Sequence, residues 1–273
     1  MSTGISYVYA VSRAGTLSGV TSGGAAGLDG GALRTVESGG LAALVSSVPD
    51  EAFGSEGMKA QMEDLKRLEQ IARGHHAVVE AAYGATTVLP LRLATVYLSD
   101  TRVAAMLDER RSEFAELLSW LEGHVELGVK VYADPHGPAD ERPPADELAA
   151  TDHVSAAPAS PGRAYLQQRR TQRRQQQNAY RAAGELAAGV PDRVAAVARA
   201  RVVHRPQQGE LASSQGENVA NDAYLVPAAR AEEFRRTLDT LADGVPGVRI
   251  EITGPWAPYS FATPPVATQG GAA

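Results

Sequence analysis

Three short runs of apolar and β-prone residues near the start of the chain predict β-strands there. The first run is SYVYAV at 6–11, where tyrosines alternate with small apolar residues. Two further runs, LRTVES at 33–38 and LAALVSSV at 41–48, are separated by Gly39-Gly40, and a glycine pair favours a tight turn. The chain therefore opens as β-structure that contains a hairpin.

Apolar residues then recur every three or four positions, which is the spacing of an amphipathic helix. We predict one helix over 57–83, with Gly74 as its weak point. A second helix is predicted over 100–123, with Ser99 or Asp100 as its N-cap. Together with the strands, these helices predict an N-terminal α+β domain over 1–123.

The second half of the chain predicts strands and helices in the order β-α-β-β-α-β. The expected elements are a strand at 124–134, a helix at 162–199, strands at 200–212 and 217–226, a helix at 228–243 and a last strand at 248–256. This order is the ferredoxin-like arrangement, in which both helices cover one face of a four-stranded antiparallel sheet. We therefore expect an α+β chain of two domains, the second a modified ferredoxin-like domain over 124–261.

Three stretches interrupt these patterns. Residues 14–31 are rich in Gly, Ser and Ala, which predicts a flexible loop. Residues 134–162 carry six prolines and several acidic side chains, and predict a long insertion or linker within the second domain. Residues 262–273 show no periodicity and predict a flexible tail.

Composition narrows the class of protein. The 273 residues are 44% hydrophobic and 21% charged, close to the averages of globular proteins. Cysteine is absent, which excludes disulfides, thiolate nucleophiles and cysteine-bound zinc. The net charge of −6 argues against a surface that coats nucleic acid or anionic lipid. Since neither a secretory signal nor a membrane span is apparent, we expect a cytoplasmic protein with no membrane partner.

A search for catalytic, cofactor-binding or metal-binding motifs finds none. The chain has no Gly-Lys pair for a phosphate-binding loop and no Gly-x-Gly-x-x-Gly after a strand. The adjacent His75 and His76 point about 100° apart on a helix, so one metal ion could not use both. We expect one of them on the surface and the other packed. The sequence therefore predicts no enzyme, no cofactor and no metal.

Six arginines without an intervening acidic residue form the strongest local charge. They are Arg163, Arg169, Arg170, Arg173, Arg174 and Arg181. Such a cluster could contact a phosphate backbone, but RNA-binding sheets of this topology present stacking aromatics in a motif that this chain lacks. We interpret the cluster as a solvated helix face, neutralised by the acidic insertion or an acidic partner, and expect no nucleic acid.

Two motifs remain unexplained by composition. In LPLRLAT at 89–95, Arg92 lies within an apolar run, where a buried arginine would need a carboxylate or carbonyl partner. GPWAPYSF at 254–261 contains two prolines and three aromatic residues within a short stretch. This segment is either a structural plug that covers the end of the sheet or the interface between domains, or an anchor for another protein, because tryptophan and tyrosine are common hot spots of interfaces.

With these motifs the chain resembles the gas vesicle protein F/L family, accessory proteins encoded beside the gas vesicle shell protein. The resemblance rests on YVYAV near the start, LPLRLATVY at 89–97, GHVELGVKVY at 123–132, NDAYLV at 221–226 and GPWAPYSF at 254–261. The family usually shows R-F-G-T where this chain has Arg92-Leu93-Ala94-Thr95. It usually shows G-P-W-P-P-Y-S-F where this chain has Ala257.

The resemblance implies two α+β domains, the second a modified ferredoxin-like fold, and a role in gas vesicle assembly without catalysis. It implies binding of the hydrophobic shell protein or of other accessory proteins, in the cytoplasm and in association with gas vesicles. The residues expected to bind a partner or to form structural motifs are Arg92, Tyr224, Pro255, Trp256, Tyr259 and Phe261. The alternatives are an anion or small-ligand binding protein that uses Arg92 in an interdomain cleft, and an RNA-binding protein that uses the arginine-rich helix.

Overall fold

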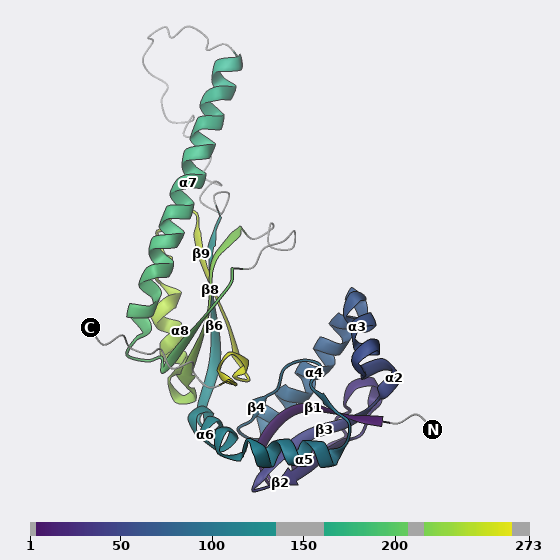
Figure 1. The fold of residues 1–273 in the computed structure, drawn as a ribbon. Coiled ribbons are helices and arrows are strands. Elements are labelled where there is room, and N and C mark those ends of the chain that lie inside the picture. The colour runs from purple at the N-terminus through teal and green to yellow at the C-terminus, as the bar shows by residue number, and fades with distance from the viewer. Residues whose placement is uncertain (1–3, 135–160, 207–215, 264–273) are drawn as a thin grey trace, which may run out of the picture. The chain divides into compact units, whose positions relative to one another are not determined.

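A computed structural model describes residues 4–134, 161–206 and 216–263 of the chain (Figure 1). These residues form two compact units. The first comprises Met1–Glu126 together with Pro255–Ala273, and the second comprises Leu127–Gly254. Most of the insertion expected at 134–162, and most of the tail expected at 262–273, lies outside the described residues.

The first unit is built on an antiparallel sheet. Its strands are β1 (Gly4–Arg13), β2 (Leu33–Ser38), β3 (Leu41–Pro49), β4 (Leu89–Pro90) and β5 (Val96–Tyr97). The strand order is β2-β3-β1-β4, and β5 also pairs with β1. The predicted hairpin is confirmed, since Gly39 and Gly40 join β2 to β3 with φ values of 58° and 81° that favour glycine. Central β1 is buried on both faces from Ile5 to Ser12.

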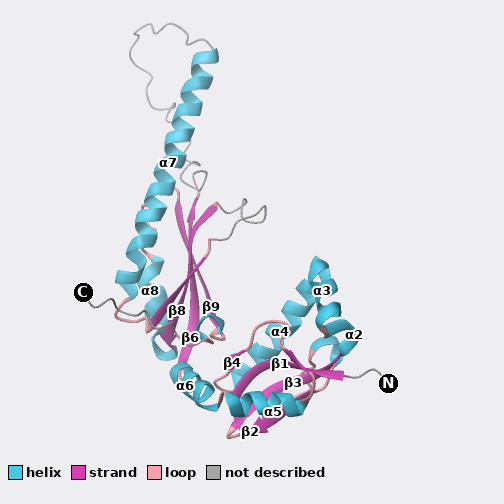
Figure 2. Cartoon of the chain, in the orientation of Figure 1, coloured by secondary structure: helices cyan, strands magenta, loops and turns pink. Residues whose placement is uncertain are grey.

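Helices cover both faces of this sheet. They are α1 (Ser18–Ser22), α2 (Asp50–Phe53), α3 (Ser55–Glu63), α4 (Leu65–Ala85), α5 (Asp100–Glu109) and α6 (Arg111–Leu121), with short 3-10 turns η1 (Leu28–Gly30) and η5 (Tyr259–Phe261). Figure 2 shows α4 and α5 on opposite faces of the sheet. Ile71, Val78 and Val79 of α4 form a buried cluster with Tyr7 and Tyr9 of β1. One buried cluster of the first unit thus lies between α4 and the sheet.

Both predicted helices of this unit are divided in two. The helix expected over 57–83 breaks at Asp64, whose extended backbone ends α3 and whose carboxylate accepts hydrogen bonds from the N–H groups of Lys66 and Arg67. The helix expected over 100–123 breaks at Arg110. Periodicity alone does not reveal these breaks, because the apolar positions keep a helical spacing across them. Ser99 caps α5, as expected, by accepting from the N–H of Arg102.

The interpretation of 14–31 as a flexible loop is wrong. This segment contains α1 and η1, and Leu17, Val20 and Leu28 are buried in the same cluster as the sheet. The N–H of Leu28 donates a hydrogen bond of 2.8 Å to the Tyr9 hydroxyl. Three apolar side chains, spaced among glycines, are therefore enough to fix the segment on the core.

The second unit contains another antiparallel sheet and two main helices. Its elements are β6 (His124–Ala133, which begins in the first unit), α7 (Pro161–Val194), β7 (Ala200–His204), β8 (Glu217–Pro227), η4 (Ala228–Arg230), α8 (Ala231–Asp239) and β9 (Val248–Trp256). The strand order is β7-β8-β6-β9, which is consistent with the expected ferredoxin-like arrangement. Figure 1 shows α7 and α8 on the same side of this sheet.

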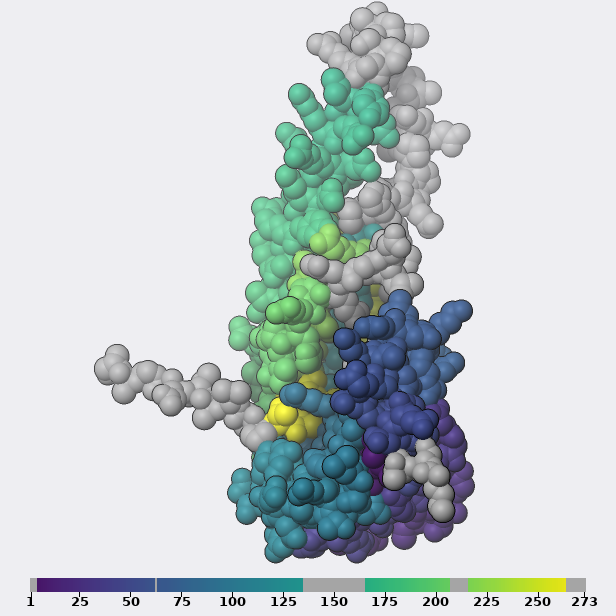
Figure 3. Space-filling view, turned by 45° about the vertical axis from the view of Figure 1, so that its right-hand side comes forward, coloured from purple at the N-terminus to yellow at the C-terminus, as the bar shows by residue number. Residues whose placement is uncertain are grey.

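Helix α7 runs without interruption through Gly184, Gly189 and Pro191, although glycine and proline often interrupt a helix. Ala179 and Ala183 pack against Val131 and Ala133 of β6 in one buried cluster. Toward its N-terminus the helix loses this support, and residues 165–178 are all exposed. This stretch forms the green column near the top of the space-filling view (Figure 3).

The end of the chain packs elsewhere than the sequence predicts. Residues 255–261 were expected in the C-terminal domain, but they belong to the first unit. The reason is that Ala257 is buried in the cluster of Tyr7, Tyr9 and Ile71, where Tyr259 also packs. The first unit is therefore assembled from two segments that are distant in sequence.

Candidate functional site

The segment GPWAPYSF divides into an exposed and a buried part. Pro255 and Trp256 are exposed at the end of β9, and 40% of Trp256 is accessible to solvent. Ala257, Pro258 and Phe261 are buried. The buried residues fit the plug interpretation, and the anchor interpretation remains a hypothesis about the exposed Pro255 and Trp256.

Two carboxylates hold the buried part in place. The Ala257 N–H donates to Glu80 Oε1 at 3.2 Å. The Ser260 N–H donates to Glu126 Oε2 at 2.8 Å, and the Ser260 hydroxyl donates to Glu126 Oε1 at 2.7 Å. Because proline has no N–H, the bond to Glu80 requires a residue such as alanine at 257, where the family usually shows proline. Neither Glu80 nor Glu126 was identified from the sequence; for Glu126 the available signal was its polar position in an alternating strand.

Aromatic rings surround the turn that Ala257–Phe261 makes. The Trp256 ring lies 5.7 Å from the His76 ring, edge on, and the Tyr259 ring lies 6.1 Å from His76 and 6.3 Å from His75 between centroids. Burial raises the pKa of Tyr259 well above its usual value. Within the described residues, its buried hydroxyl has no hydrogen-bond partner.

His75 is the packed histidine of the pair and His76 the more exposed one, as expected. His75 Nε2 lies 3.2 Å from the Leu91 carbonyl oxygen, which can only accept, so Nε2 carries the proton. Nδ1 then accepts from the Tyr7 hydroxyl at 3.0 Å, and that hydroxyl accepts from the Ala94 N–H at 2.9 Å. Desolvation by burial lowers the pKa of His75 to about 4, so the ring is neutral at pH 7. This network fixes the loop that carries Arg92.

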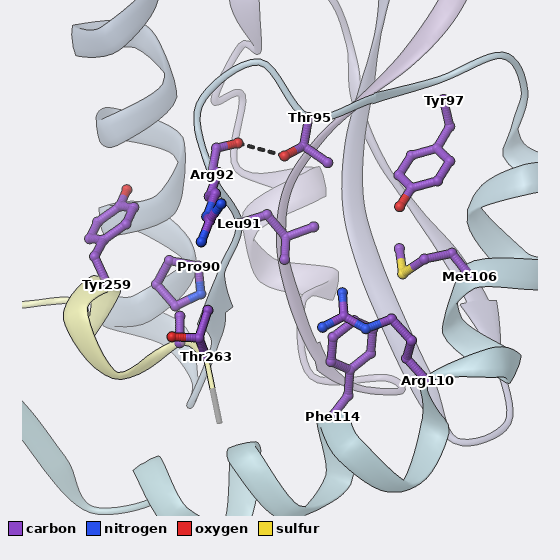
Figure 4. Close-up of a pocket in the computed structure, with 11 residues that line it drawn as sticks. Pro90, Leu91, Arg92, Thr95, Tyr97, Met106, Arg110, Phe114, Tyr259 and Thr263 are labelled. Atoms are coloured by element: carbon purple, nitrogen blue, oxygen red, sulfur yellow. Dashed lines mark hydrogen bonds between the residues drawn. The ribbon is translucent and has the colours of Figure 1, made fainter. Parts of the chain in front are cut away.

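Arg92 is exposed, so the case of a buried arginine that needs a carboxylate or carbonyl partner does not arise. Its backbone carbonyl accepts from the Thr95 hydroxyl at 2.7 Å, but no hydrogen bond or ion pair of its side chain is found among the described residues. Two residues further along the loop, Ala94 has a positive φ of 65°. Arg92 and Tyr259 line one cavity of the first unit (Figure 4).

Tyr224 belongs to the second unit and is buried in β8. Its ring lies 5.3 Å from that of Phe234 in α8. Its hydroxyl donates to Asp222 Oδ2 at 3.5 Å, and Asp222 also pairs with Arg201 at 2.8 Å. Burial raises the pKa of Tyr224 well above its usual value. These contacts fit packing between helix and sheet.

Arg169, Arg170, Arg173 and Arg174 lie on the exposed part of α7, and Arg181 is exposed as well, which agrees with the interpretation of a solvated helix face. Arg169 Nε donates to the Tyr165 hydroxyl at 3.0 Å, and its guanidinium lies 5.6 Å from the centre of the Tyr165 ring. Over the described ranges, no cluster of three or more histidine and carboxylate side chains could hold a metal ion. No helix in those ranges is long and apolar enough to cross a membrane.

Comparisons with known proteins agree with this architecture. Two crystal structures of the gas vesicle protein GvpF, from Anabaena sp. PCC7120 and from Microcystis aeruginosa, superpose with TM-scores of 0.63 and 0.62 at 20% and 18% identity. Each comparison covers 95% of this chain, and 96% and 99% of the respective crystal chains. At this identity the likeness shows the fold.

Sequence similarity is stronger. The chain is 41% identical over 258 residues to gas vesicle protein L of Streptomyces sp. (strain CB03234), covering 94% of this chain and 92% of that protein. It is 28% identical over 265 residues to gas vesicle protein F of the same organism, covering 93% and 98%. The model of one family, described as gas vesicle synthesis protein GvpL/GvpF, matches residues 5–263. Because that match includes both units and the returning C-terminal segment, the chain belongs to the GvpL/GvpF family of gas vesicle synthesis proteins.

Proposed function

We propose that this chain is an accessory protein of gas vesicle assembly that binds the hydrophobic shell protein, other accessory proteins, or both, while the vesicle nucleates and grows. The observation that carries the proposal is Trp256, an exposed indole next to a turn that is buried and held by two carboxylates. A large aromatic side chain fixed before binding loses little conformational entropy on association and suits an interface anchor.

The family itself consists of gas vesicle accessory proteins and is not a known enzyme family. We therefore propose a role in binding without catalysis, in the cytoplasm and in association with gas vesicles. We also propose that the two units fold as domains, the second a modified ferredoxin-like one. In this proposal Pro255 and Trp256 contact the partner, while Tyr259, Phe261 and Tyr224 support the two cores.

The test is capture of partners from cells that express the complete gas vesicle gene set. Tagged wild type should retain the shell protein or other accessory proteins, and Trp256→Ala should retain markedly less while its melting temperature stays close to that of wild type. Trp120→Ala is the matched control, since Trp120 is the other tryptophan of the chain and lies half-buried on α6. The proposal fails if wild type retains no gas vesicle protein at low salt and deletion of the gene leaves vesicles normal.

A further inference from the structure

One cavity of the first unit combines charge with an apolar lining. It has a volume of about 400 Å³ and lies between the loop after β4, helices α5 and α6, and the end of the described chain at Tyr259–Thr263 (Figure 4). The residues that line it are Pro90, Leu91, Arg92, Thr95, Tyr97, Met106, Arg110, Phe114, Tyr259, Ala262 and Thr263. The lining thus contains two arginines and no acidic side chain.

The two arginines differ in what they already bind. Arg110 donates to both carboxylate oxygens of Glu113 at 2.8 and 2.6 Å, and its guanidinium lies 4.4 Å from the centre of the Phe114 ring. The positive charge of Arg110 is therefore already neutralised by the carboxylate of Glu113. Arg92 has no such side-chain partner among the described residues and is exposed. Among the described residues, nothing therefore compensates the positive charge of Arg92 in this cavity.

The remaining wall is mostly apolar. Leu91, Met106 and the ring of Phe114 supply hydrocarbon and sulfur surface, and the rings of Tyr97 and Tyr259 flank it (Figure 4). A ligand that fits must bring a negative charge to Arg92 and an apolar group to this wall. A guanidinium binds a carboxylate or a phosphate through two parallel hydrogen bonds, and the unmodified side chains of a protein supply such an anion as the carboxylates of Asp and Glu.

We propose that this pocket receives an acidic side chain of a protein partner, with Arg92 as its counter-ion and an apolar neighbour of that side chain against Leu91 and Met106. The inference rests on the proposed function, because it specifies how one partner is held. A protein partner is favoured over a small molecule because Arg92 is exposed and the side chain of Arg110 is 43% accessible. Small-molecule sites usually enclose most of the ligand surface, whereas an open pocket suits a side chain that projects from another protein.

Short peptides test this chemistry directly on the full chain. We would titrate the ¹⁵N-labelled protein with acetyl-Leu-Glu-Leu-amide and with acetyl-Leu-Gln-Leu-amide, and follow amide shifts by NMR. The two peptides differ only in the carboxylate. Wild type should bind the glutamate peptide about tenfold more tightly, as expected for one hydrogen-bonded charge pair. Shifts should concentrate on residues that line the cavity.

Variants assign the preference to Arg92. Arg92→Gln should abolish the difference between the two peptides, and Arg92→Glu should instead prefer acetyl-Leu-Lys-Leu-amide. Arg102→Gln is the matched control: it removes one exposed arginine from α5 outside the cavity and should keep the preference of wild type. The inference is overturned if wild type binds both peptides equally or neither, or if the preference survives in Arg92→Gln. It is also overturned if sodium butyrate binds as tightly as the glutamate peptide, since a free carboxylate would then be the ligand.

Partner capture separates this inference from the proposed function. If wild type and Arg92→Gln retain the same gas vesicle proteins equally well, the assembly role stands and the pocket is not where the partner binds. If wild type retains none, the assembly role fails, and the peptide titration still decides whether the pocket recognises an acidic side chain. The assembly role and the pocket as the binding site are both supported if Arg92→Gln retains less of the gas vesicle proteins than wild type while Arg102→Gln retains as much.

Discussion

At the scale of single residues, Ala94 has a backbone conformation that its side chain disfavours. Its φ is 65°, in the left-handed region, which costs a non-glycine residue about 1–2 kcal/mol. The hydrogen bond from its N–H to the Tyr7 hydroxyl holds it there. The family usually shows glycine at this place in the motif, and the observed φ supplies a physical reason.

Ala94→Gly should therefore raise the free energy of unfolding by about 0.5–1 kcal/mol, because relief of the left-handed strain exceeds the added entropy of the unfolded glycine. Denaturant titration of wild type and variant measures the difference. Ala104→Gly, in the middle of α5, is the control and should lose about 1 kcal/mol. A loss of stability in Ala94→Gly as well would contradict the assignment of strain.

Removal of either of two buried tyrosine hydroxyls in the same core should have different effects on the stability of the protein. The Tyr7 hydroxyl bridges the Ala94 N–H and His75, so Tyr7→Phe leaves both unpaired and should cost about 1–3 kcal/mol. The Tyr259 hydroxyl has no partner among the described residues, so Tyr259→Phe should be neutral or stabilising by up to about 1 kcal/mol. Equal losses in the two variants, measured by urea unfolding, would refute this difference.

The buried neutral imidazole of His75 makes stability depend on pH. Its pKa of about 4 lies below the ordinary 6.5, so between these values the unfolded state binds the proton and the folded state does not. The contribution of the neutral His75 ring to the free energy of unfolding is therefore fully present above about pH 6.5. This contribution falls by roughly 3 kcal/mol on acidification to pH 4. The side chains that face the His75 ring are those of Tyr7, Tyr9, Tyr259 and His76. None of these four is a carboxylate, so none would raise the pKa of His75.

Unfolding free energies measured from pH 4 to 7 test this dependence. His75→Gln should flatten the slope in that range, at the cost of lower stability at pH 7. His76→Gln, which changes a half-exposed ring, is the control. A slope that is the same in His75→Gln as in wild type would show that other groups carry the pH dependence.

At the scale of elements, the segment 14–31 shows how few apolar residues suffice to order a glycine-rich stretch. Leu17 is 1% exposed and packs with Leu28 and the sheet, so Leu17→Ala should cost about 2–5 kcal/mol. The substitution would cost almost nothing if the segment were free in solution. Thermal unfolding of this variant beside Leu65→Ala, which changes a 79% exposed leucine, distinguishes the two cases.

The elements that follow a regular apolar period were predictable from the sequence. The hairpin at Gly39-Gly40, the alternating strand β6 and the order of the second unit are all found where the sequence places them. The break at Asp64 and the burial of Leu17 were not, because both depend on tertiary contacts that leave the local pattern unchanged. For the candidate site, the GPWAPYSF and LPLRLAT motifs were identified, but their partners Glu80, Glu126 and Tyr7 lie far away in sequence.

At the scale of the whole molecule, the chain leaves the first unit after Glu126 and returns to it at Pro255. Ser260 binds Glu126 across 134 positions of sequence, and Ala257 reaches Glu80 across 177. The end of the chain is thus part of the core of the first unit. The backbone next to Trp256 is therefore positioned only when the first unit is folded.

Because Phe261 is buried and Trp256 is exposed, we expect substitution of these two aromatic residues to have different effects on stability and on partner capture. Phe261 is 6% exposed, so Phe261→Ala should lower the free energy of unfolding by about 3–5 kcal/mol. Trp256 keeps 40% of its surface in solvent, so Trp256→Ala should lower it by only about 1 kcal/mol while it reduces the capture of gas vesicle proteins. Melting curves and partner capture on the same preparations provide both readouts. If Trp256→Ala instead destabilised the protein as much as Phe261→Ala and left capture unchanged, the whole segment would be a plug, and the partner would have to bind elsewhere.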